Sequence, residues 1–489
     1  MYSLPISTPE AQGISSSAVT RFVNRLAELN YVHGFAVIRH GKIIAEGYRE
    51  GCSAADKHQL FSLSKSFVSS AIGIAYGEGL LTPDSLLVDF FPEYLSDKVT
   101  DRMRRLKLRH LLSMSSGHSS CAIGRYSSKY SWRSEGETLP VNERTWVKNF
   151  LEDELPFEPG EKFIYNSGAT FMLSAVIQRV TGENVSTYLR KRLFDKLGFD
   201  LDLYWEKNPE GIDLGGWGFN LSVRELAAFA NLWLNKGALN GEQIIPTAYY
   251  EEATKKQISN GEVNDVSDWV QGYGFQFWRC RNNCFRGDGY AGQLALMIPE
   301  HDAAVVMTGG MPMMQRELDA AFDFLLPEFK ASPLPEDIPA YLTLNEATHS
   351  MKFDLGPCGE VNPDFSFAEI EVQENAMDLK KIVLLQDSNG MTLRYFFKHR
   401  GVDIYEAGFK ELRTGCINLV TQNFPLRTVG RCHWENPTTA VLCFAIPQSP
   451  SIFTIKLVLD APSGSTCIYM DTPIWFAHEK LQNQELLRK

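Results

Sequence analysis

The stretch FSLSKSFVSSAIGIAYGEGLL, residues 61–81, begins with alternating serines and continues as a long run of small and apolar residues. Three of the serines, Ser62, Ser64 and Ser66, surround a single lysine, Lys65. A helix that is apolar or small on almost every side lies between other elements rather than on a surface. The stretch therefore predicts a buried helix over residues 66–81 that follows a polar turn.

Ser62 and Lys65 are three residues apart, a spacing that places two side chains on one face of a helix. Serine is a weak nucleophile until a base removes its proton, and a lysine one turn away can be that base. Ser64 and Ser66 have no lysine at this offset, so Ser62 is the candidate nucleophile. Taken alone, the four residues slightly favour a simple helix cap at Ser62 with Lys65 exposed on the first turn.

The stretch EKFIYNSGATFML, residues 161–173, contains Tyr165, Asn166 and Ser167 between a strand-like run and a predicted helix. A tyrosine beside a buried lysine can move protons, because the cation favours the phenolate and lowers the pKa of the phenol. The alternative for this triplet is a turn with a tyrosine in the core.

The stretch FRGDGYAGQLALMIP, residues 285–299, places glycines before an inner strand. Gly287 and Gly289 would let the backbone approach a ligand closely. The edge of such a strand can offer a backbone N–H to an oxyanion. A glycine-rich hairpin turn without a function is the alternative.

Size and charge limit the classes of function. At 489 residues the chain is too long for one ordinary core, so we expect two domains. The net charge of -11 and the lack of a run of basic residues argue against a nucleic-acid partner. The first residues do not have the pattern of a signal peptide, and no apolar stretch approaches the roughly 20 residues of a spanning helix. We therefore expect a cytoplasmic protein without membrane contact.

Cysteine and histidine patterns give no sign of a metal. The nine cysteines are scattered and odd in number, which is typical of thiols in a reducing compartment. Cys280 and Cys284 lack the spacing of a zinc site, and the ten histidines show no metal-binding motif. We expect no metal site and no cofactor.

Periodicity divides the chain into two domains. Residues 1–330 mix a predicted hairpin, 34–50, and two strands, 293–310, with helices, and this mixture predicts an α+β domain. The helices are expected in residues 11–30, 106–120, 169–195, 223–237 and 316–329.

A proline-rich linker is expected at residues 331–340. Short β-rich runs in residues 341–489 predict an antiparallel β-domain, a barrel or a sandwich. We expect this second domain to be a lid, a spacer or a contact between copies of the chain in a homo-oligomer.

In their order, SLSK, YNS and GDG resemble the motifs of the β-lactamase-related serine hydrolases, which include class C β-lactamases, DD-peptidases and esterases. The resemblance runs from about residue 10 to residue 329, through RHGKIIAEGY (39–48), LLSMSSGH (111–118) and GQLALMIPEHDAAVVMT (292–308). It implies their fold, an α/β sandwich in which helices flank an antiparallel sheet. The β-rich second domain lies outside the resemblance.

The resemblance also implies roles for single residues. Ser62 would be the acylated nucleophile and Lys65 would accept its proton. Tyr165 would protonate the leaving group and then activate water. Ser167 would stand where relatives have a polar residue that contacts the substrate or the lysine.

The third triplet would be Gly287, Asp288 and Gly289, next to the substrate. The oxyanion hole would consist of the backbone N–H groups of Ser62 and Tyr290.

Two departures from the motifs bear on the substrate. Gly287 occupies a position where relatives that act on β-lactams have a cation or a histidine, although Arg286 is one residue away. Ser167 stands where class C β-lactamases have asparagine. Both departures favour a small carboxylic ester or amide as the substrate, hydrolysed through an acyl-enzyme. A β-lactamase, DD-peptidase or D-aminopeptidase activity is the alternative, and a binding module without catalysis is the alternative from another class.

Further residues could line the pocket. Aromatic residues in 215–220 (GGWGFN) and 269–278 (WVQGYGFQFW) either line it or pack in the core, and core packing is the simpler reading. His118 either faces the site or belongs to a turn at a helix end.

Overall fold

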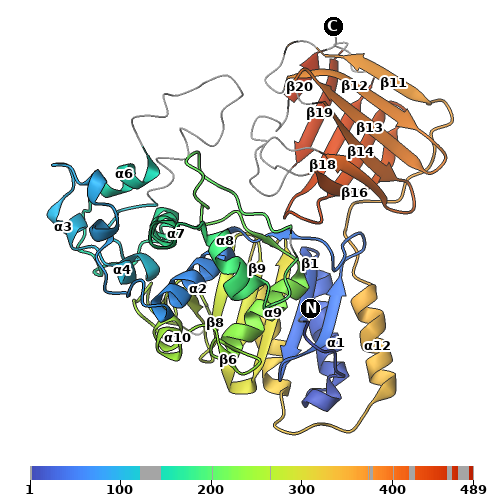
Figure 1. Ribbon diagram of the computed structural model, residues 1–489. Coiled ribbons are helices and arrows are strands. Elements are labelled where there is room, and N and C mark those ends of the chain that lie inside the picture. Colours follow the sequence, from blue (N-terminus) through green and yellow to red (C-terminus); the bar gives the residue numbers. More distant parts are fainter. Residues whose placement is uncertain are drawn as a thin grey trace.

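Figure 1 shows the computed structural model of the chain, with a mixed helical and β part at the N-terminal side and a second part made of strands. It describes residues 3–121, 145–200, 202–264, 266–372, 374, 378–399, 401–417 and 425–459, and the strands β19 (Ser465–Asp471) and β20 (Gln484–Leu487).

A six-stranded sheet, with strand order β2-β1-β10-β9-β8-β7, lies at the centre of the N-terminal part, and all its pairs are antiparallel. Its first hairpin turns at His40 and Gly41, whose φ values of 47° and 70° are those that tight hairpin turns need. The strands are β1 (Val32–Arg39), β2 (Lys42–Tyr48), β7 (Trp278–Arg279), β8 (Phe285–Gly289), β9 (Gln293–Ile298) and β10 (Ala303–Gly309).

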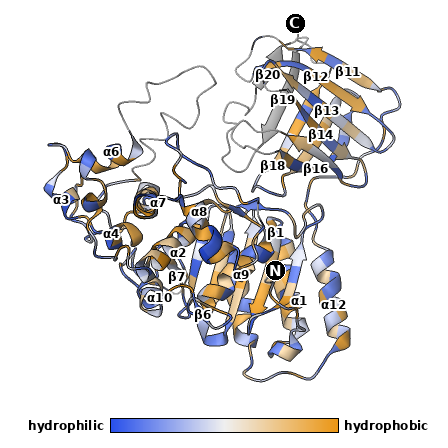
Figure 2. Ribbon diagram, in the orientation of Figure 1, coloured by the Kyte–Doolittle hydropathy of each residue, from blue (hydrophilic) through white to orange (hydrophobic). Residues whose placement is uncertain are grey.

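Helices cover both faces of this sheet, as Figure 1 shows. Because successive strand residues point to opposite faces, Phe35 and Val37 join a core with α1 and α11, whereas Ala36 and Ile38 join a larger core with α2 and α9. Figure 2 shows the strands between these helices as mainly hydrophobic. The helices around the sheet are α1 (Ser16–Leu29), α2 (Ser64–Gly77), α9 (Val223–Leu234), α10 (Thr247–Thr254), α11 (Gln315–Phe324) and α12 (Ile338–His349). The expected α+β sandwich is confirmed.

The buried helix predicted over residues 66–81 is present as α2, although it begins at Ser64 and ends at Gly77. Its residues 64–75 are all buried. Gly73 allows α10 to pack closely, since a Cβ at this position would lie 2.7 Å from the ring of Tyr249. The polar turn before the helix is a short 3-10 turn, η2 (Phe61–Leu63).

The predicted helix over residues 106–120 is wrong in its length. Helix α4 covers only Leu108–Leu112, because Met114 has a φ of 57° and turns the chain out of the helical path. The run before Tyr165 was expected to be strand-like, but residues 162–165 form no strand. The backbone N–H of Ile164 instead donates a hydrogen bond to Met114 O at 2.8 Å.

Two helices follow, as predicted for residues 169–195. Helix α7 (Ser167–Thr181) ends at Gly182, which has a left-handed φ of 72°, and α8 (Val185–Leu189) comes directly after it. The remaining elements of this part are η1 (Glu10–Gln12), β3 (His58–Gln59), η3 (Leu87–Phe90), η4 (Pro92–Tyr94), α3 (Asp101–Arg104), α6 (Trp146–Leu151), η5 (Arg190–Phe194), β4 (Asn220–Leu221), β5 (Ala238–Leu239), β6 (Glu242–Gln243), η6 (Pro299–His301) and η7 (Leu326–Glu328).

The second part is a curled sheet of ten strands that follow one another in sequence order, as Figure 1 shows. Its antiparallel, all-β character confirms the prediction for this domain. Buried and less buried residues alternate along β14, as expected for a strand with one face toward a core. The strands before β19 are β11 (Phe367–Glu371), β12 (Leu379–Gln386), β13 (Gly390–Phe397), β14 (Val402–Gly408), β15 (Arg413–Ile417), β16 (Leu426–Asn436), β17 (Thr439–Ala445) and β18 (Ile452–Val458).

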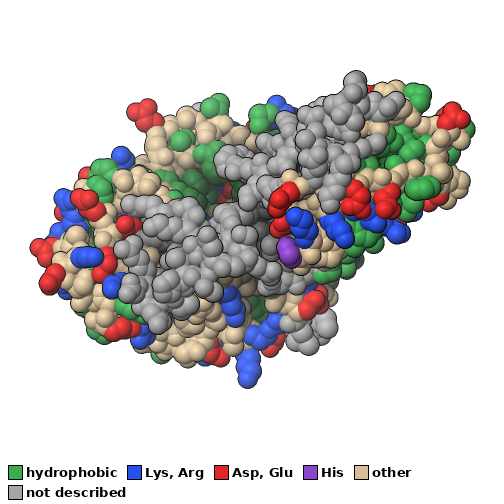
Figure 3. Space-filling model, turned by 90° about the horizontal axis from the view of Figure 1, so that it is seen from above, with side chains coloured by type: hydrophobic (Ala, Val, Ile, Leu, Met, Phe, Trp, Pro, Cys, Tyr) green, Lys and Arg blue, Asp and Glu red, His purple; other side chains and the backbone are tan. Residues whose placement is uncertain are grey.

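Helix α12 connects the two parts. It begins inside the proline-rich stretch 331–340, and its Leu344 belongs, together with Met351, to the core around α1. The chain therefore leaves the N-terminal part only after residue 351. Among the helices of the described residues, none is long and apolar enough to cross a membrane. Figure 3 shows acidic and basic side chains interspersed over the face seen from above.

Candidate active site

Ser62 lies in η2, immediately before the first turn of α2. The preceding residue, Phe61, has a φ of 47°, a left-handed conformation that is costly for an aromatic residue and typical of functional turns. The side chain of Ser62 is partly exposed, whereas Leu63 and Ser64 are buried. The strained turn therefore presents Ser62 at the accessible end of a buried helix.

Lys65 is buried, and its Nζ atom has three oxygen neighbours. Nζ lies 3.0 Å from Ser62 Oγ, 3.0 Å from Ser167 Oγ and 2.6 Å from Gly216 O. Burial lowers the pKa of Lys65 to about 7, although the nearby Cys121 acts in the opposite direction. At neutral pH a large share of Lys65 is therefore an uncharged amine that can accept a proton.

The neighbours of Lys65 also orient this amine. A neutral amine has two N–H groups and one lone pair, and Gly216 O can only accept a hydrogen bond. When Gly216 O and Ser167 Oγ accept the two N–H groups, the lone pair is directed to the hydroxyl of Ser62. Because Lys65 is buried, the alternative of a lysine exposed on the first turn is wrong.

Two of the predicted residues, Tyr165 and Ser167, lie at the start of α7. Asn166 caps this helix, since its Oδ1 accepts the N–H of Gly168 at 2.9 Å. Ser167 is the first residue of the helix and Tyr165 is the residue before the cap. The YNS triplet thus brings a hydroxyl to Lys65 and a phenol to Ser62.

Gly216 is a site residue that sequence reasoning missed. A Cβ at Gly216 would lie 3.0 Å from the Cβ of Ser167, so the lack of a side chain lets this backbone approach Ser167 and Lys65 without crowding. The segment 215–220 was considered for its aromatic side chains, but it contributes a carbonyl oxygen instead. The glycine pair Gly215-Gly216 was the available signal.

Tyr165 differs from the expectation in its acidity. Burial raises the pKa of its phenol above the ordinary value, and the negative charge of Asp288 adds to this, while a hydrogen bond with Ser62 opposes it. Nζ of Lys65 lies 4.8 Å from the ring centroid, but the expected lowering of the pKa is wrong. Tyr165 is a neutral phenol at rest, suited to donate a proton.

Two aromatic side chains, Trp278 and Tyr273, pack against the ring of Tyr165. Its ring stacks on Trp278, with centroids 5.6 Å apart and planes at 23°. Tyr273 lies edge-on to both rings, at 6.4 Å from Tyr165 and 5.1 Å from Trp278. Part of the segment 269–278 therefore borders the site. His118 instead is buried against Phe150.

The glycines of β8 serve a packing purpose. A Cβ at Gly287 would lie 2.9 Å from Ser66 Oγ, and a Cβ at Gly289 would lie 2.1 Å from Leu60 O. The two glycines let β8 run directly along the nucleophile turn, rather than leaving room for a ligand. Tyr290 follows at the turn, 45% exposed, with its ring 5.8 Å from that of Phe61. A shared oxyanion hole of the Ser62 and Tyr290 amides stays a prediction.

Asp288 and Arg286 form a buried ion pair, with Nε and Oδ2 2.8 Å apart. Arg286 also donates to Asp268 O at 2.9 Å and to Cys280 Sγ at 3.0 Å. The charge of Arg286 is therefore neutralised inside the protein. This pairing argues against Arg286 as a replacement for the cation or histidine that relatives have at the position of Gly287.

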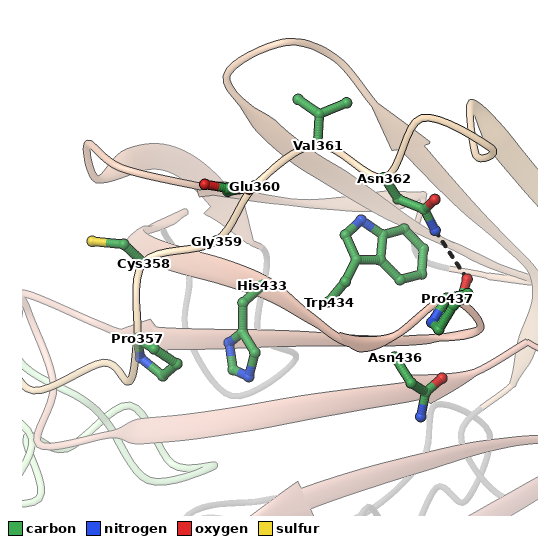
Figure 4. A pocket seen from close by; sticks show the side chains of 10 residues that line it. All are labelled: Pro357, Cys358, Gly359, Glu360, Val361, Asn362, His433, Trp434, Asn436 and Pro437. Atoms are coloured by element: carbon green, nitrogen blue, oxygen red, sulfur yellow. Dashed lines mark hydrogen bonds between the residues drawn. The ribbon is translucent and has the colours of Figure 1, made fainter.

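A separate hollow of about 510 Å³ lies on the C-terminal domain and is shown in Figure 4. Residues 357–362 form one side of it, and His433 and Trp434 of β16 form another. The indole N–H of Trp434 donates to Gln386 Oε1 at 2.7 Å and the amide of Asn362 donates to Pro437 O at 2.9 Å. None of the predicted catalytic residues lines it.

If Lys65 removes the proton of Ser62, the rate at which a test ester is hydrolysed should depend on the titration of Lys65. Because only the neutral amine accepts the proton of Ser62, kcat/KM for a neutral ester should rise as the pH rises through about 7, the pKa of Lys65. Initial rates on a p-nitrophenyl ester, corrected for spontaneous hydrolysis, measure this profile. A rate that is constant from about pH 5.5 to about pH 8 would contradict the assignment of Lys65 as the base.

The chain is similar to known proteins in sequence and in fold. A family model described as Beta-lactamase matches residues 26–326. The 6-aminohexanoate-dimer hydrolase of Paenarthrobacter ureafaciens is 24% identical over 288 residues, which are 57% of this chain and 72% of that protein. Lovastatin esterase of Penicillium rubens is 28% identical over 170 residues, 32% of this chain and 42% of that protein.

A solved structure, "Putative 6-aminohexanoate-dimer hydrolase from Bacillus anthracis", superposes with a TM-score of 0.54 at 20% identity. The superposed region covers 69% of this chain and 89% of the other chain. At this identity the likeness shows the shared fold alone. The family match, by contrast, extends over more than half of the sequence. The chain therefore belongs to the beta-lactamase family.

Proposed function

We propose that the protein is a serine hydrolase that forms an acyl-enzyme on Ser62 with a carboxylic ester or small amide. The observation that carries the proposal is the position of Lys65, whose Nζ lies 3.0 Å from Ser62 Oγ and whose pKa burial lowers to about 7. A serine beside such an amine can lose its proton at neutral pH as it attacks a carbonyl carbon.

Acylation uses Ser62, Lys65 and Tyr165 in sequence. Lys65 takes the proton of Ser62 while Oγ bonds to the carbonyl carbon of the substrate. The amides of Ser62 and Tyr290 stabilise the oxyanion that forms. As the bond to the leaving group breaks, Tyr165 donates its phenolic proton to the leaving oxygen or nitrogen, and Lys65 returns a proton to the phenolate. Lys65 and Tyr165 are thus restored, and the net change is the transfer of one proton from Ser62 to the leaving group.

Deacylation reverses the direction of the protons. Tyr165 accepts a proton from water and passes its own to Lys65, while the water oxygen bonds to the acyl carbon. Lys65 then protonates Ser62 as the acyl group leaves as a carboxylic acid. The interaction of the phenol of Tyr165 with the hydroxyl of Ser62, which opposes the rise of the phenol's pKa, supports a role of Tyr165 in both halves of the reaction.

The third motif favours uncharged substrates. Arg286 is paired with Asp288 inside the protein, and Gly287 supplies no cation in its place. A substrate carboxylate would therefore meet no free positive charge from these residues. One relative is named lovastatin esterase, which agrees with an ester as the substrate, whereas another is named "Putative D-alanyl-D-alanine carboxypeptidase". We propose neutral esters and small amides over β-lactams.

Covalent labelling tests the proposal. A fluorophosphonate should add one equivalent to the wild-type protein, and peptide mass mapping should locate it on Ser62. Ser62→Ala should abolish the adduct. Ser64→Ala is the matched control and should still be labelled, because Ser64 Oγ is buried and accepts the N–H of Phe219 at 3.2 Å.

Two outcomes would contradict the proposal. An unlabelled wild-type protein would favour a binding module without catalysis, and equal labelling of Ser62→Ala would place the nucleophile elsewhere. Rapid turnover of nitrocefin together with no hydrolysis of p-nitrophenyl esters would replace the ester and amide assignment with a β-lactamase.

A further inference from the structure

The nucleophile turn is preceded by a very short strand outside the central sheet. β3 consists of His58 and Gln59 and pairs only with β4, in a separate two-stranded sheet. A two-stranded pair is marginally stable by itself. Leu60 extends this pairing, since its N–H donates to Phe219 O at 2.9 Å. The segment that leads into Ser62 therefore needs support from another side.

The C-terminal domain supplies that support through Gln448, in the loop between β17 and β18. The backbone oxygen of Gln448 accepts the N–H of Gln59 at 3.0 Å. The side-chain oxygen of Gln448 accepts the N–H of Arg427, the second residue of β16, at 3.1 Å. One residue of the second domain thus bonds both to the β3 segment and to its own sheet.

An ion pair reinforces this contact. Arg427 Nη2 bonds Asp56 Oδ2, and the Asp56 side chain is only 13% exposed. The same carboxylate oxygen accepts the N–H of Ser53 at 2.7 Å. Because Asp56 is mostly withdrawn from water, loss of Arg427 would leave a largely buried carboxylate without this partner, which is costly. It attaches the segment 53–59 to the edge of the β16 strand.

Apolar packing makes the contact between the domains a close one. Phe353, Leu355, Val429 and Ala445 form a buried cluster with Cys52 packed against it. A Cβ at Gly51, whose φ is 85°, would lie 2.8 Å from Val429. Domains joined by a polar and loosely packed contact move relative to each other, whereas this packed cluster holds the two domains in one orientation.

The effect of this contact reaches Ser62 through Leu60. The carbonyl of Leu60 accepts the N–H of Leu63 at 3.0 Å and so closes the η2 turn. The same oxygen is the atom that lies against Gly289 of β8. A shift of Gln59 therefore moves both the turn that carries Ser62 and its spacing from the strand that precedes Tyr290.

From these contacts we infer that the C-terminal β-domain positions the nucleophile, with Arg427 and Gln448 as positioning residues that hold the segment 56–60. The inference rests on the proposed function, in which Ser62 is acylated. It assigns the second domain a part in the reaction without any contact between that domain and the substrate.

Arg427→Ala tests the inference in the full-length protein. The rate constant for fluorophosphonate labelling of Ser62 and kcat for ester hydrolysis should both fall about 5- to 20-fold, because small misplacements of a reacting group are costly. KM should change less than kcat, since Arg427 bonds Asp56 and is proposed to act on the position of Ser62 rather than on the substrate. Arg427→Lys, which keeps a cation for Asp56, should recover most of the rate.

Arg413→Ala is the matched control. Arg413 also belongs to the C-terminal sheet and forms ion pairs with Asp387 at 2.9 Å and Glu406 at 3.5 Å, but these contacts stay within that domain. Its rates should remain within about twofold of wild type, as expected for independent sites. Gln448→Ala is a second variant that keeps both charges, and its labelling rate should fall about threefold.

Thermal unfolding and the labelling site separate the outcomes. Unchanged labelling of folded Arg427→Ala and Gln448→Ala would overturn the inference while leaving the proposed function intact. The same loss in Arg413→Ala would also overturn it, because the effect would then be general destabilisation. A wild-type protein that is not labelled on Ser62 would overturn both. If Arg427→Ala does not fold, a wild-type labelling rate in folded Gln448→Ala overturns the inference, and a reduced rate in Gln448→Ala supports it.

Discussion

Lys65→Ala should lower kcat/KM for ester hydrolysis by about three to five orders of magnitude while the protein stays folded. Nζ of Lys65 is the amine that contacts Ser62 Oγ, and Ser167 and Gly216 orient it. Without it, the serine has to lose its proton to water as it attacks. When a base and a nucleophile act as a unit, removing either one abolishes almost all of the rate acceleration that the two provide together.

Lys65→Met is the control for the cavity that alanine leaves. Methionine fills a similar volume without a charge, and replacing a buried charge by an apolar group of the same size is often neutral or stabilising. The variant should therefore be as inactive as Lys65→Ala, with an unchanged or higher Tm. Steady-state rates on p-nitrophenyl esters and thermal unfolding measure both effects. A loss of less than about tenfold in folded Lys65→Met would mean that Lys65 is not the base.

Tyr165→Phe should have the second largest effect, and its size should depend on the leaving group. The phenylalanine ring can keep the stacking on Trp278, so the fold should persist. For an alkyl ester or an amide, whose leaving group needs a proton, kcat/KM should fall about 10²- to 10⁴-fold. For a p-nitrophenyl ester, whose leaving group departs as an anion, the acylation rate should fall about tenfold or less.

Tyr273→Phe is the matched control for this prediction. Tyr273 is a buried tyrosine of the same aromatic cluster, edge-on to Tyr165 and Trp278, and it has no assigned part in the reaction. Its rates on both substrates should stay within about threefold of wild type. Equal losses of Tyr165→Phe on alkyl and p-nitrophenyl esters would show that Tyr165 does not protonate the leaving group.

Elements with a strong local signal could be predicted from the sequence. The run of small and apolar residues predicted α2 as a buried helix, and His40-Gly41 predicted the first hairpin. The boundaries were less predictable. The helix over 106–120 proved to be five residues long, because Met114 leaves the helical conformation to bond Ile164, a residue distant in sequence.

The candidate site was predictable where chemistry requires particular side chains. Ser62, Lys65, Tyr165 and Ser167 were chosen from spacing and resemblance, and the fold brings them together. Gly216 was not chosen, because it takes part through a backbone oxygen that every residue type has. The pairing of Arg286 with Asp288 was not foreseen either, although strand alternation puts both on one face of β8.

The sequence by itself determined the identity of the reacting groups, since the spacing of Ser62 and Lys65 follows from the geometry of one helix turn. Only the tertiary structure decided how those groups behave. Burial lowers the pKa of Lys65 and keeps Tyr165 protonated, and a pKa depends on everything that excludes water from the group. The contacts of Gln448 and Arg427 with the segment before Ser62 were likewise set by the packing of two domains. Those partners lie hundreds of residues apart along the chain, where no local pattern relates them.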